Sequence, residues 1–322
     1  MYKMTMSVRI GDTYIRRLEK ITISRSVENL CDTATIVIPS ARYNAPFPLS
    51  EDIKVGADVK IELGYNDRVT TEFKGYVNKI TANDGTVTVE CEDEIYLFRV
   101  DMKNESIAKA SVSAILERCA DAVKKAKGKR FAIDCDYNFL YDKFTICNTT
   151  AYEVIKKIQE EAKPNIYIKD STLHVHPQYT KTSGIADYDF AVNIDRDGTD
   201  LTYKTPEDQK LIVEVTSKNS KGETIKVTEG TPGGDRIQLN MPQVTDEESL
   251  RTAAREMLSR KVYSGYEGSF TGWLIPYCDA GYKVNLTDRE KEYRSGTYYV
   301  TAVEVEFSQA GGKRKVTIGK KL

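Results

Sequence analysis

The chain has 322 residues, more than one simple hydrophobic core usually serves, so we expect about two to four domains. Its 47 basic and 48 acidic side chains nearly cancel, which argues against a dedicated nucleic-acid coat. The N-terminus has no apolar signal segment, and no stretch approaches the roughly 20 apolar residues that cross a bilayer. We therefore expect a protein that is neither secreted by the usual signal nor inserted in a membrane.

The six cysteines predict structural thiols. None of them lies in a C-x-x-C pair, so we expect neither a zinc ribbon nor a redox motif. Reduced, mostly buried thiols are typical of a protein that folds in the cytoplasm.

Residues 1–99 have the pattern of β-structure. Apolar residues alternate at 33–38, 59–63 and 87–91, which is the period of a strand with one buried face. Pro46 and Pro48 cannot donate to a strand ladder, so the segment around them is a predicted loop.

In the next segment, 100–178, the period becomes helical. Apolar residues from Val112 to Val123 recur every three or four positions, which predicts one buried helix face. Lysines fill the last turn and Gly128 follows, as the helix dipole and the C-cap prefer.

A second helix is predicted by a capping box of Thr150 and Glu153, and Pro164 ends it. Residues 165–176 then alternate around a polar turn, which predicts a β-hairpin. The segment 100–178 is therefore a predicted α+β domain of two helices and a hairpin.

The polar segment 179–210 predicts an irregular connection or a small third domain. A capping box of Thr245 and Glu248 predicts a third helix over 246–262. Between them, strand signals resume in three short segments: 211–215, 224–227 and 236–239.

One strand pattern occurs twice, near residue 56 and again near residue 281. In each copy a glycine opens a strand of alternating apolar residues, a second glycine opens another strand, and a third strand follows. The expected fold is therefore mainly β with an α+β part: two similar small β-barrels, 1–99 and 211–322, and a peripheral helix-and-hairpin domain. The positions that define the barrels are Gly56, Val59, Ile61, Gly75 and Val77 in the first copy, and Gly281, Val284, Leu286, Gly296 and Val300 in the second.

His174 and His176 are the only histidines. An H-x-H pair on a strand points both rings to one face and could supply two ligands to a metal ion. No third ligand stands nearby in the sequence, so we expect an exposed strand face and neither a metal nor a cofactor.

The acidic run Glu90, Glu92, Asp93 and Glu94 could supply the carboxylates of a glycosidase or a cation site. Such a density of acids is common on surfaces, and the run lies at a strand end, so we expect no catalytic role. No nucleophile elbow, phosphate loop or dinucleotide motif occurs, and we expect no enzyme activity.

The basic stretches are 124–130, 313–315 and 320–321. They are expected to be a helix end and a solvated terminal strand. A surface that meets a polyanion stays open as the alternative.

The order of these motifs resembles the baseplate hub proteins of contractile phage tails, which include the late control protein D group, the Mu-type tail hub and the hub part of type VI secretion spikes. The resembling stretches cover most of the chain in the expected order. They are 55–65, 73–77 and 89–93, then the helix and hairpin over 149–176, and then 245–258, 268–272, 280–284, 296–300 and 307–309.

The resemblance implies a homotrimer in which each chain gives two similar barrels to a pseudo-sixfold ring around a central channel. One face would meet the sixfold tail tube and the other a threefold spike, with DNA only passing through the channel. It implies a structural protein of the virion tail baseplate that assembles in the bacterial cytoplasm. No part of the chain resembles the needle and effector extensions of secretion spikes or a lysozyme insertion, so we expect a separate spike protein.

A second interpretation stays open: a carbohydrate-binding or cell-wall-degrading β-barrel module. It requires a concave pocket with clustered aromatic residues or paired carboxylates, for which Glu92 and Asp93 are the candidates. The single tryptophan, Trp273, makes it the weaker interpretation.

Overall fold

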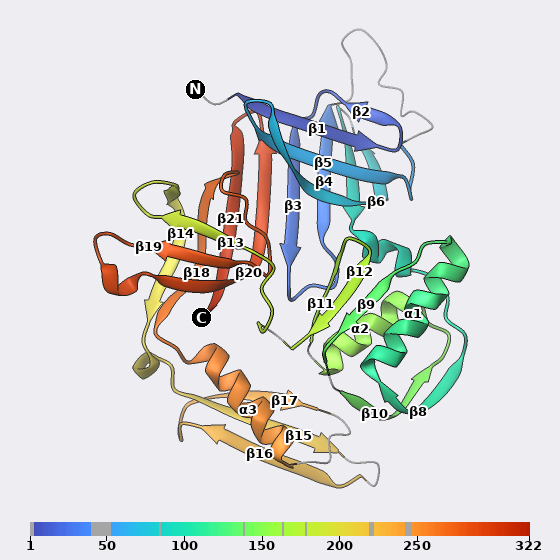
Figure 1. Cartoon of the computed structure of the whole chain (residues 1–322), viewed down its shortest axis with the longest axis vertical. Helices are drawn as coiled ribbons and strands as arrows, with labels where there is room; N and C mark the ends of the chain where they lie inside the picture. The colour runs from blue at the N-terminus through green and yellow to red at the C-terminus, as the bar shows by residue number, and fades with distance from the viewer. Residues whose placement is uncertain are drawn as a thin grey trace.

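A computed structural model describes residues 3–39, 53–83, 85–137, 139–162, 164–177, 179–218, 222–241 and 247–322. The described chain is mainly β-structure with three α-helices. Figure 1 shows the large sheet at the top, a helix-and-sheet part at the lower right and a helix packed on a small sheet at the bottom. The predicted fold class is confirmed at this level.

Thirteen strands form the large sheet, in the order β14-β18-β21-β20-β3-β4-β7-β6-β5-β1-β2, with β19 beside β20 and β13 beside β19. The strands from the N-terminal part are β1 (Met4–Ile10), β2 (Thr13–Ile15), β3 (Lys20–Ser26), β4 (Thr33–Pro39), β5 (Asp58–Tyr65), β6 (Arg68–Asn83) and β7 (Thr86–Glu92). Those from the C-terminal part are β13 (Ile185–Asp189), β14 (Ile194–Lys204), β18 (Gly265–Trp273), β19 (Lys283–Thr287), β20 (Gly296–Ser308) and β21 (Gly311–Lys321).

The two strand repeats are joined into one continuous sheet, so the prediction of two similar small β-barrels is wrong for the described residues. β20 pairs with β3 from Ala302 opposite Ser26 to Ser308 opposite Lys20. One buried apolar cluster runs through both halves, from Ile23 and Val59 to Val284 and Val305. Pairing two open strand edges satisfies backbone groups that each half alone would leave exposed.

The α+β part confirms both predicted helices and the hairpin. Helix α1 (Val112–Lys127) has the Ser111 hydroxyl accepting from the Ala114 N–H at 3.2 Å, and it ends at Gly128 with φ +72°. Helix α2 (Ala151–Ala162) follows Thr150, whose hydroxyl accepts from the Glu153 N–H at 3.3 Å. Strands β11 (Asn165–Lys169) and β12 (Thr172–His176) form the hairpin, with Asn165 opposite His176.

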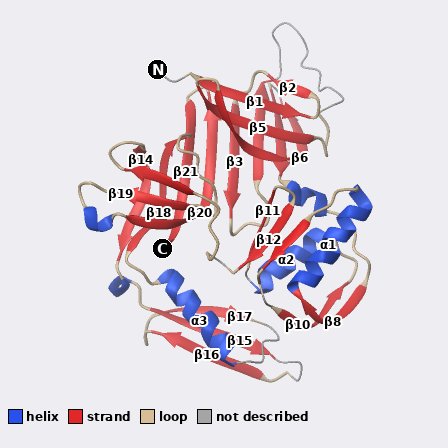
Figure 2. Cartoon of the chain, viewed as in Figure 1, coloured by secondary structure: helices blue, strands red, loops and turns tan. Residues whose placement is uncertain are grey.

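Several short elements of this part were not predicted. Strand β9 (Ala132–Cys135) joins the hairpin in parallel with β12, and β8 (Glu105–Ser111) pairs with β10 (Leu140–Ile146). The 3-10 helix η1 (Glu94–Phe98) leads into them from β7. Figure 2 shows α1 and α2 side by side against these strands.

Residues 211–261 form a third unit instead of part of a second barrel. Strands β15 (Leu211–Lys218), β16 (Thr224–Gly230) and β17 (Asp235–Asn240) make a separate sheet that α3 (Glu247–Lys261) covers. Val213, Val215, Val227, Leu250 and Ala254 form its own buried cluster. The predicted capping residue Thr245 lies outside the described residues.

The segment 179–210, predicted as an irregular connection or a small third domain, instead supplies β13 and β14 to the large sheet. Two further single turns, η2 (Pro206–Asp208) and η3 (Glu292–Arg294), complete the described elements. None of the helices in the described ranges has both the length and the apolar character needed to span a bilayer.

The separate clusters predict separate responses to core mutations. Leu250→Ala removes a fully buried side chain and should cost about 2–5 kcal/mol within the third unit. Hydrogen exchange should accelerate in β15–β17 and α3, while the β3–β20 pairing keeps its protection.

Ile155→Ala is the matched control, because Ile155 is equally buried in α2. It should accelerate exchange in the α+β part instead. Acceleration of the large sheet by Leu250→Ala, to the same degree as in α3, would contradict separate cores.

Candidate assembly interface

The first strand repeat is built around a glycine turn. Gly56 has φ +86°, and its N–H donates to the Val77 carbonyl at 2.8 Å. The Val77 N–H returns a hydrogen bond to the Ala57 carbonyl at 2.9 Å. Glycine suits this position because a side chain is strained at such a φ. Within the strands, Gly75 of β6 lies opposite Val59 of β5.

The second repeat has the same hydrogen bonds. Gly281 has φ +81° and donates to the Val300 carbonyl at 2.9 Å, while the Val300 N–H donates to the Tyr282 carbonyl at 2.9 Å. Gly296 of β20 lies opposite Leu286 of β19. All six apolar positions singled out in the sequence are at most 3% exposed: Val59, Ile61, Val77, Val284, Leu286 and Val300.

The repeats also share a β-bulge. The β6–β7 register shifts between Val77 and Lys79, and the β20–β21 register shifts between Val300 and Ala302. Counting from the bulge, Lys79 corresponds to Ala302. The two halves are therefore equivalent in register as well as in strand order.

The equivalence extends over six strands. The path β3-β4-β7-β6-β5-β1 in one half matches β14-β18-β21-β20-β19-β13 in the other. The outer pair differs, since β1 runs antiparallel to β5 and β13 runs parallel to β19. In this scheme β14 is the counterpart of β3, and β6 is the counterpart of β20.

One difference between the halves leaves two strand edges open. Beyond Val300, β20 continues along β3. Beyond Val77, β6 pairs only with β7, and β14 pairs only with β18, in the part of the chain that the structure describes. Open strand edges are templates for pairing with another chain.

A buried ionic cluster lies where the halves meet. Glu72 of β6 is 3% exposed, and its carboxylate contacts Arg314 Nη2 of β21 at 2.6 Å and Arg25 Nη2 of β3 at 3.1 Å. The β5–β6 register shift leaves Glu72 as the extra residue of a bulge, which turns its side chain toward the core. The sequence-based expectation that 313–315 is solvated is wrong for Arg314, which is 0% exposed.

Further groups contact the two guanidinium groups, although Arg314 Nε has no hydrogen-bond partner among the described residues. Arg314 donates to the Cys278 and Leu274 carbonyls at 2.8 and 3.2 Å. Arg25 Nε lies 3.1 Å from Asp279 Oδ1. Burial acts to lower the pKa of Arg25, but the charges of Asp279, Tyr277 and Glu72 raise this pKa above its ordinary value. Arg25 therefore stays charged.

The acidic run has structural partners. Glu90 pairs with Lys79 at 3.6 Å, and Glu92 pairs with Arg99 at 2.7 Å. Glu94 pairs with Lys129 and accepts from the Ser171 N–H at 3.0 Å.

Asp93 caps the 3-10 helix, because its carboxylate accepts from the Ile95 N–H at 2.8 Å and from the Asp32 N–H at 3.0 Å. Burial raises the pKa of Asp93 to about 7. Burial and the charge of Asp93 also raise the pKa of Asp32. These contacts explain the acids as parts of the fold rather than as a catalytic pair.

The histidine pair does not lie on the exposed strand face that the sequence predicted. His176 is 2% exposed, and Asp134 of the neighbouring strand β9 lies opposite His174. The parallel strand β9 therefore supplies, from 40 residues earlier in the sequence, the third possible metal ligand that the residues near His174 lack.

Neither a protein-family model nor a curated protein matches this sequence. Solved structures match it over nearly its full length. A 43 kDa tail protein of prophage MuSo2 from Shewanella oneidensis aligns with a TM-score of 0.68 at 16% identity, covering 99% of this chain and 98% of that one. The chain has the fold of a phage tail protein.

Two further structures extend this likeness. A tail protein from Neisseria meningitidis aligns with a TM-score of 0.66 at 14% identity, covering 99% of this chain and 97% of the other. The E. coli c3393 protein, a type VI secretion component described as similar to the T4 tail proteins gp27 and gp5, aligns with a TM-score of 0.57 at 7% identity, covering 99% and 77%. The resemblance inferred from the motif order is confirmed for the fold.

Glu72→Gln should destabilise the chain by about 3–5 kcal/mol, because it leaves two buried arginines without their shared carboxylate. Urea unfolding followed by circular dichroism measures this cost. Glu306→Gln is the matched control: its surface pair with Lys20 also joins β20 to β3, and its loss should cost less than about 1 kcal/mol. Equal costs would contradict the cluster's role.

The raised pKa of Asp93 predicts a pH-dependent effect of Asp93→Asn. A carboxyl with a raised folded-state pKa stabilises the fold at low pH, and this contribution is lost as pH rises toward about 7. The variant should therefore gain stability relative to the wild type between pH 5 and pH 8, by at least about 1 kcal/mol in urea unfolding. Asp67→Asn, at an exposed ion pair, is the surface control. A difference between Asp93→Asn and wild type that is independent of pH would contradict the assignment.

Proposed function

We propose that this chain is a structural hub protein of a contractile, phage-type tail baseplate. Three copies form a pseudo-sixfold ring around a channel, to which each copy gives the two similar halves of its large sheet. The ring joins a sixfold tail tube to a threefold spike made by a separate protein. DNA only passes through the channel, and the chain itself neither catalyses a reaction nor inserts into a membrane. The copy number and the two partners come from the family resemblance.

The observation that carries the proposal is the equivalence of the two halves together with the two open edges. β20 pairs with β3 inside the chain. β6 corresponds to β20 and β14 corresponds to β3, so β6 of one copy fits β14 of the next. This contact is heterologous, and such contacts close into rings when the rotation between copies permits.

The β20–β3 pairing within the chain, here called the internal junction, gives the register of the proposed contact between copies. Val303 lies opposite Arg25, Glu304 opposite Ser24 and Val305 opposite Ile23. Between copies, the equivalent pairs are Ile80 with Tyr203, Thr81 with Thr202, Ala82 with Leu201 and Asn83 with Asp200.

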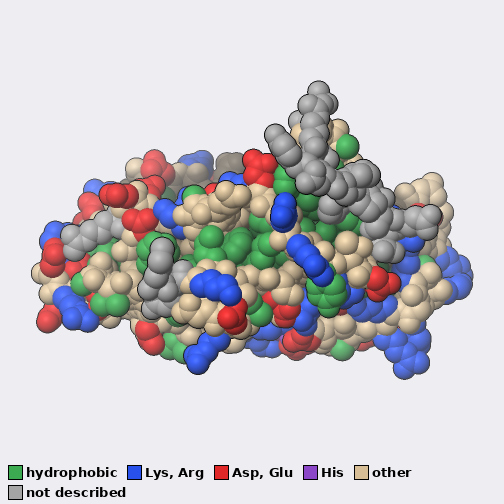
Figure 3. Space-filling model, turned by 90° about the horizontal axis from the view of Figure 1, so that it is seen from above, with side chains coloured by type: hydrophobic (Ala, Val, Ile, Leu, Met, Phe, Trp, Pro, Cys, Tyr) green, Lys and Arg blue, Asp and Glu red, His purple; other side chains and the backbone are tan. Residues whose placement is uncertain are grey.

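The charges along these edges are balanced within each copy. Lys79 would lie opposite Lys204, and each already has an acidic partner on the adjoining strand, Glu90 and Glu267 respectively. Figure 3 shows charges of both signs interspersed around a central apolar band on the face seen from above. A structural ring that lets DNA pass needs no strongly basic surface of the kind that binds it.

Disulfide trapping tests the register. Thr81→Cys with Thr202→Cys, in a Cys147→Ser background that removes the exposed native thiol, should give covalent dimers and trimers on a non-reducing gel after oxidation at high protein concentration. Directly opposed residues of an antiparallel pair are close enough for a disulfide. The ladder should end at the trimer, because the ring closes.

Two control pairs calibrate this result. Ser24→Cys with Glu304→Cys is the internal equivalent, so it should form a disulfide within a monomer. Lys79→Cys with Asp200→Cys is out of register and should remain reduced. The proposed ring is refuted if the internal pair forms while Thr81→Cys with Thr202→Cys stays monomeric, or if the out-of-register pair crosslinks equally well.

A further inference from the structure

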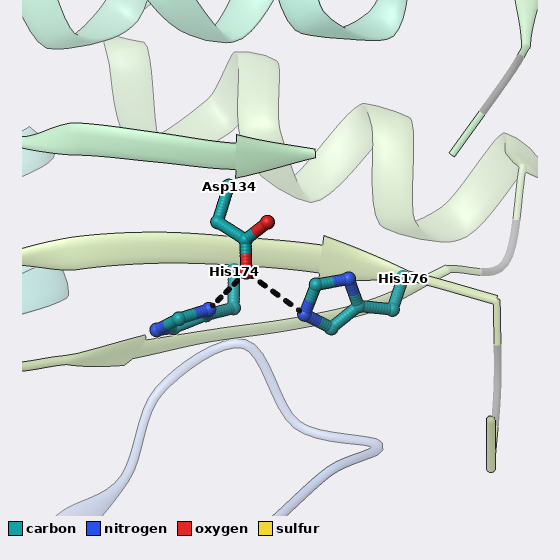
Figure 4. A group of neighbouring side chains, drawn as sticks. All are labelled: Asp134, His174 and His176. Atoms are coloured by element: carbon teal, nitrogen blue, oxygen red, sulfur yellow. Dashed lines mark hydrogen bonds and ion pairs between the residues drawn. The ribbon is translucent and has the colours of Figure 1, made fainter. Parts of the chain in front are cut away.

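Three side chains with metal-binding atoms converge on one face of the β9–β12 pair. Asp134 comes from β9, and His174 and His176 come from β12. Their ligand atoms all lie within 4.8 Å of one another. Figure 4 shows the two imidazole rings on either side of one Asp134 oxygen, to which both point a nitrogen.

His176 has the arrangement typical of a metal ligand. Its side chain is 3% exposed, and Nδ1 lies 2.7 Å from Asp136 Oδ1. Histidines that bind metals usually donate their other N–H to a carboxylate, which fixes the tautomer and the ring orientation. Nδ1 in the donor role leaves Nε2 as the free ligand atom.

The surroundings of Nε2 require a cation. Nε2 is buried without a hydrogen-bond partner among the described residues, and it lies 3.6 Å from Asp134 Oδ2. A neutral ring would direct its lone pair at a negatively charged oxygen, an unfavourable contact in a buried place. Either a metal ion between the two atoms or a proton on Nε2 removes this conflict.

His174 and Asp134 complete the set. His174 Nδ1 lies 2.9 Å from the same Asp134 oxygen, and its ring stacks on Tyr167 with centroids 4.9 Å apart. Lys181 approaches the other Asp134 oxygen at 3.7 Å and Asp136 at 3.0 Å, which leaves Oδ2 to the histidines.

We propose that Asp134 Oδ2, His174 Nδ1 and His176 Nε2 bind one divalent transition-metal ion, with Zn²⁺ as the best fit. Two imidazole nitrogens and one carboxylate oxygen are ligands that Zn²⁺ accepts, at about 2.0–2.2 Å, with a fourth position for water. The separations of 2.9 and 3.6 Å around Oδ2 bracket the spacing that tetrahedral ligands adopt at such bond lengths. The ion would tie β9 to the end of β12, where the chain leaves the α+β part for the large sheet.

Zinc titration of the full chain, prepared without a histidine tag in the Cys147→Ser background, tests the proposal. Long-range ¹H–¹⁵N spectra of the imidazoles suit this chain because it has only two histidines. One equivalent of Zn²⁺ should shift Nδ1 of His174 and Nε2 of His176, and EDTA should reverse both shifts. Absence of a saturable shift, with Nε2 of His176 protonated at pH 7, would overturn the proposal in favour of a histidinium that bridges two carboxylates.

Variants distinguish this site from adventitious binding. His176→Ala and Asp134→Asn should each weaken Zn²⁺ binding at least about tenfold by calorimetry, and Asp136→Asn should weaken it by about 10–100-fold through the lost orienting bond. Glu19→Gln, at an exposed carboxylate away from the site, should leave binding unchanged. Unaltered affinity in folded Asp134→Asn, with the fold checked by circular dichroism, would also overturn the proposal.

Discussion

The Arg25–Glu72–Arg314 cluster is the contact on which the arrangement of the two halves depends. Three charges buried together are costly unless each is paired, and here a single carboxylate serves two guanidinium groups. The cluster takes Glu72 from the first half and Arg314 from the second, next to the β3–β20 junction. The alternation of buried residues and the β3–β20 pairing set the register of the joined sheet, and the paired charges add a second constraint between the two halves.

The same cluster makes the two kinds of junction in the proposed ring unequal. By register, Tyr203 takes the place of Arg25 and Val87 that of Arg314 at the contact between copies. In the proposed ring that contact would therefore lack the buried ion pairs, and it would consist of strand pairing in which apolar and polar residues alternate. The β3–β20 pairing within a chain is therefore stronger than the proposed β6–β14 contact between copies. This difference suits a ring whose copies fold alone and assemble when the tail tube and spike are present.

Periodicity predicted the elements whose signals are local. Helix α1, helix α2 and the β11–β12 hairpin follow from apolar spacing and from caps such as Thr150 and Gly128, because each depends on neighbours in sequence. The repeat around Gly56 and Gly281 was also visible, since positive φ and the alternation after it leave a clear pattern.

The rest depends on contacts between distant residues. Arg314 alternates with Val316 and Ile318, which point into the core, so the alternation of the strand is consistent with its burial. Its partner Glu72, however, lies 242 residues away in the sequence. The bulge that turns Glu72 inward has no sequence signature. Likewise, the pairing of β12 with β9 brings Asp134 to the histidines, and the residues near His174 in the sequence do not predict this pairing.

A cryo-electron microscopy reconstruction of the assembled protein is the most direct test of the central claim. The account predicts a threefold ring in which β6 of each copy continues into β14 of the next, in the register that β20 makes with β3. A ring that closes through other surfaces, or a β6 edge covered by its own chain, would contradict it.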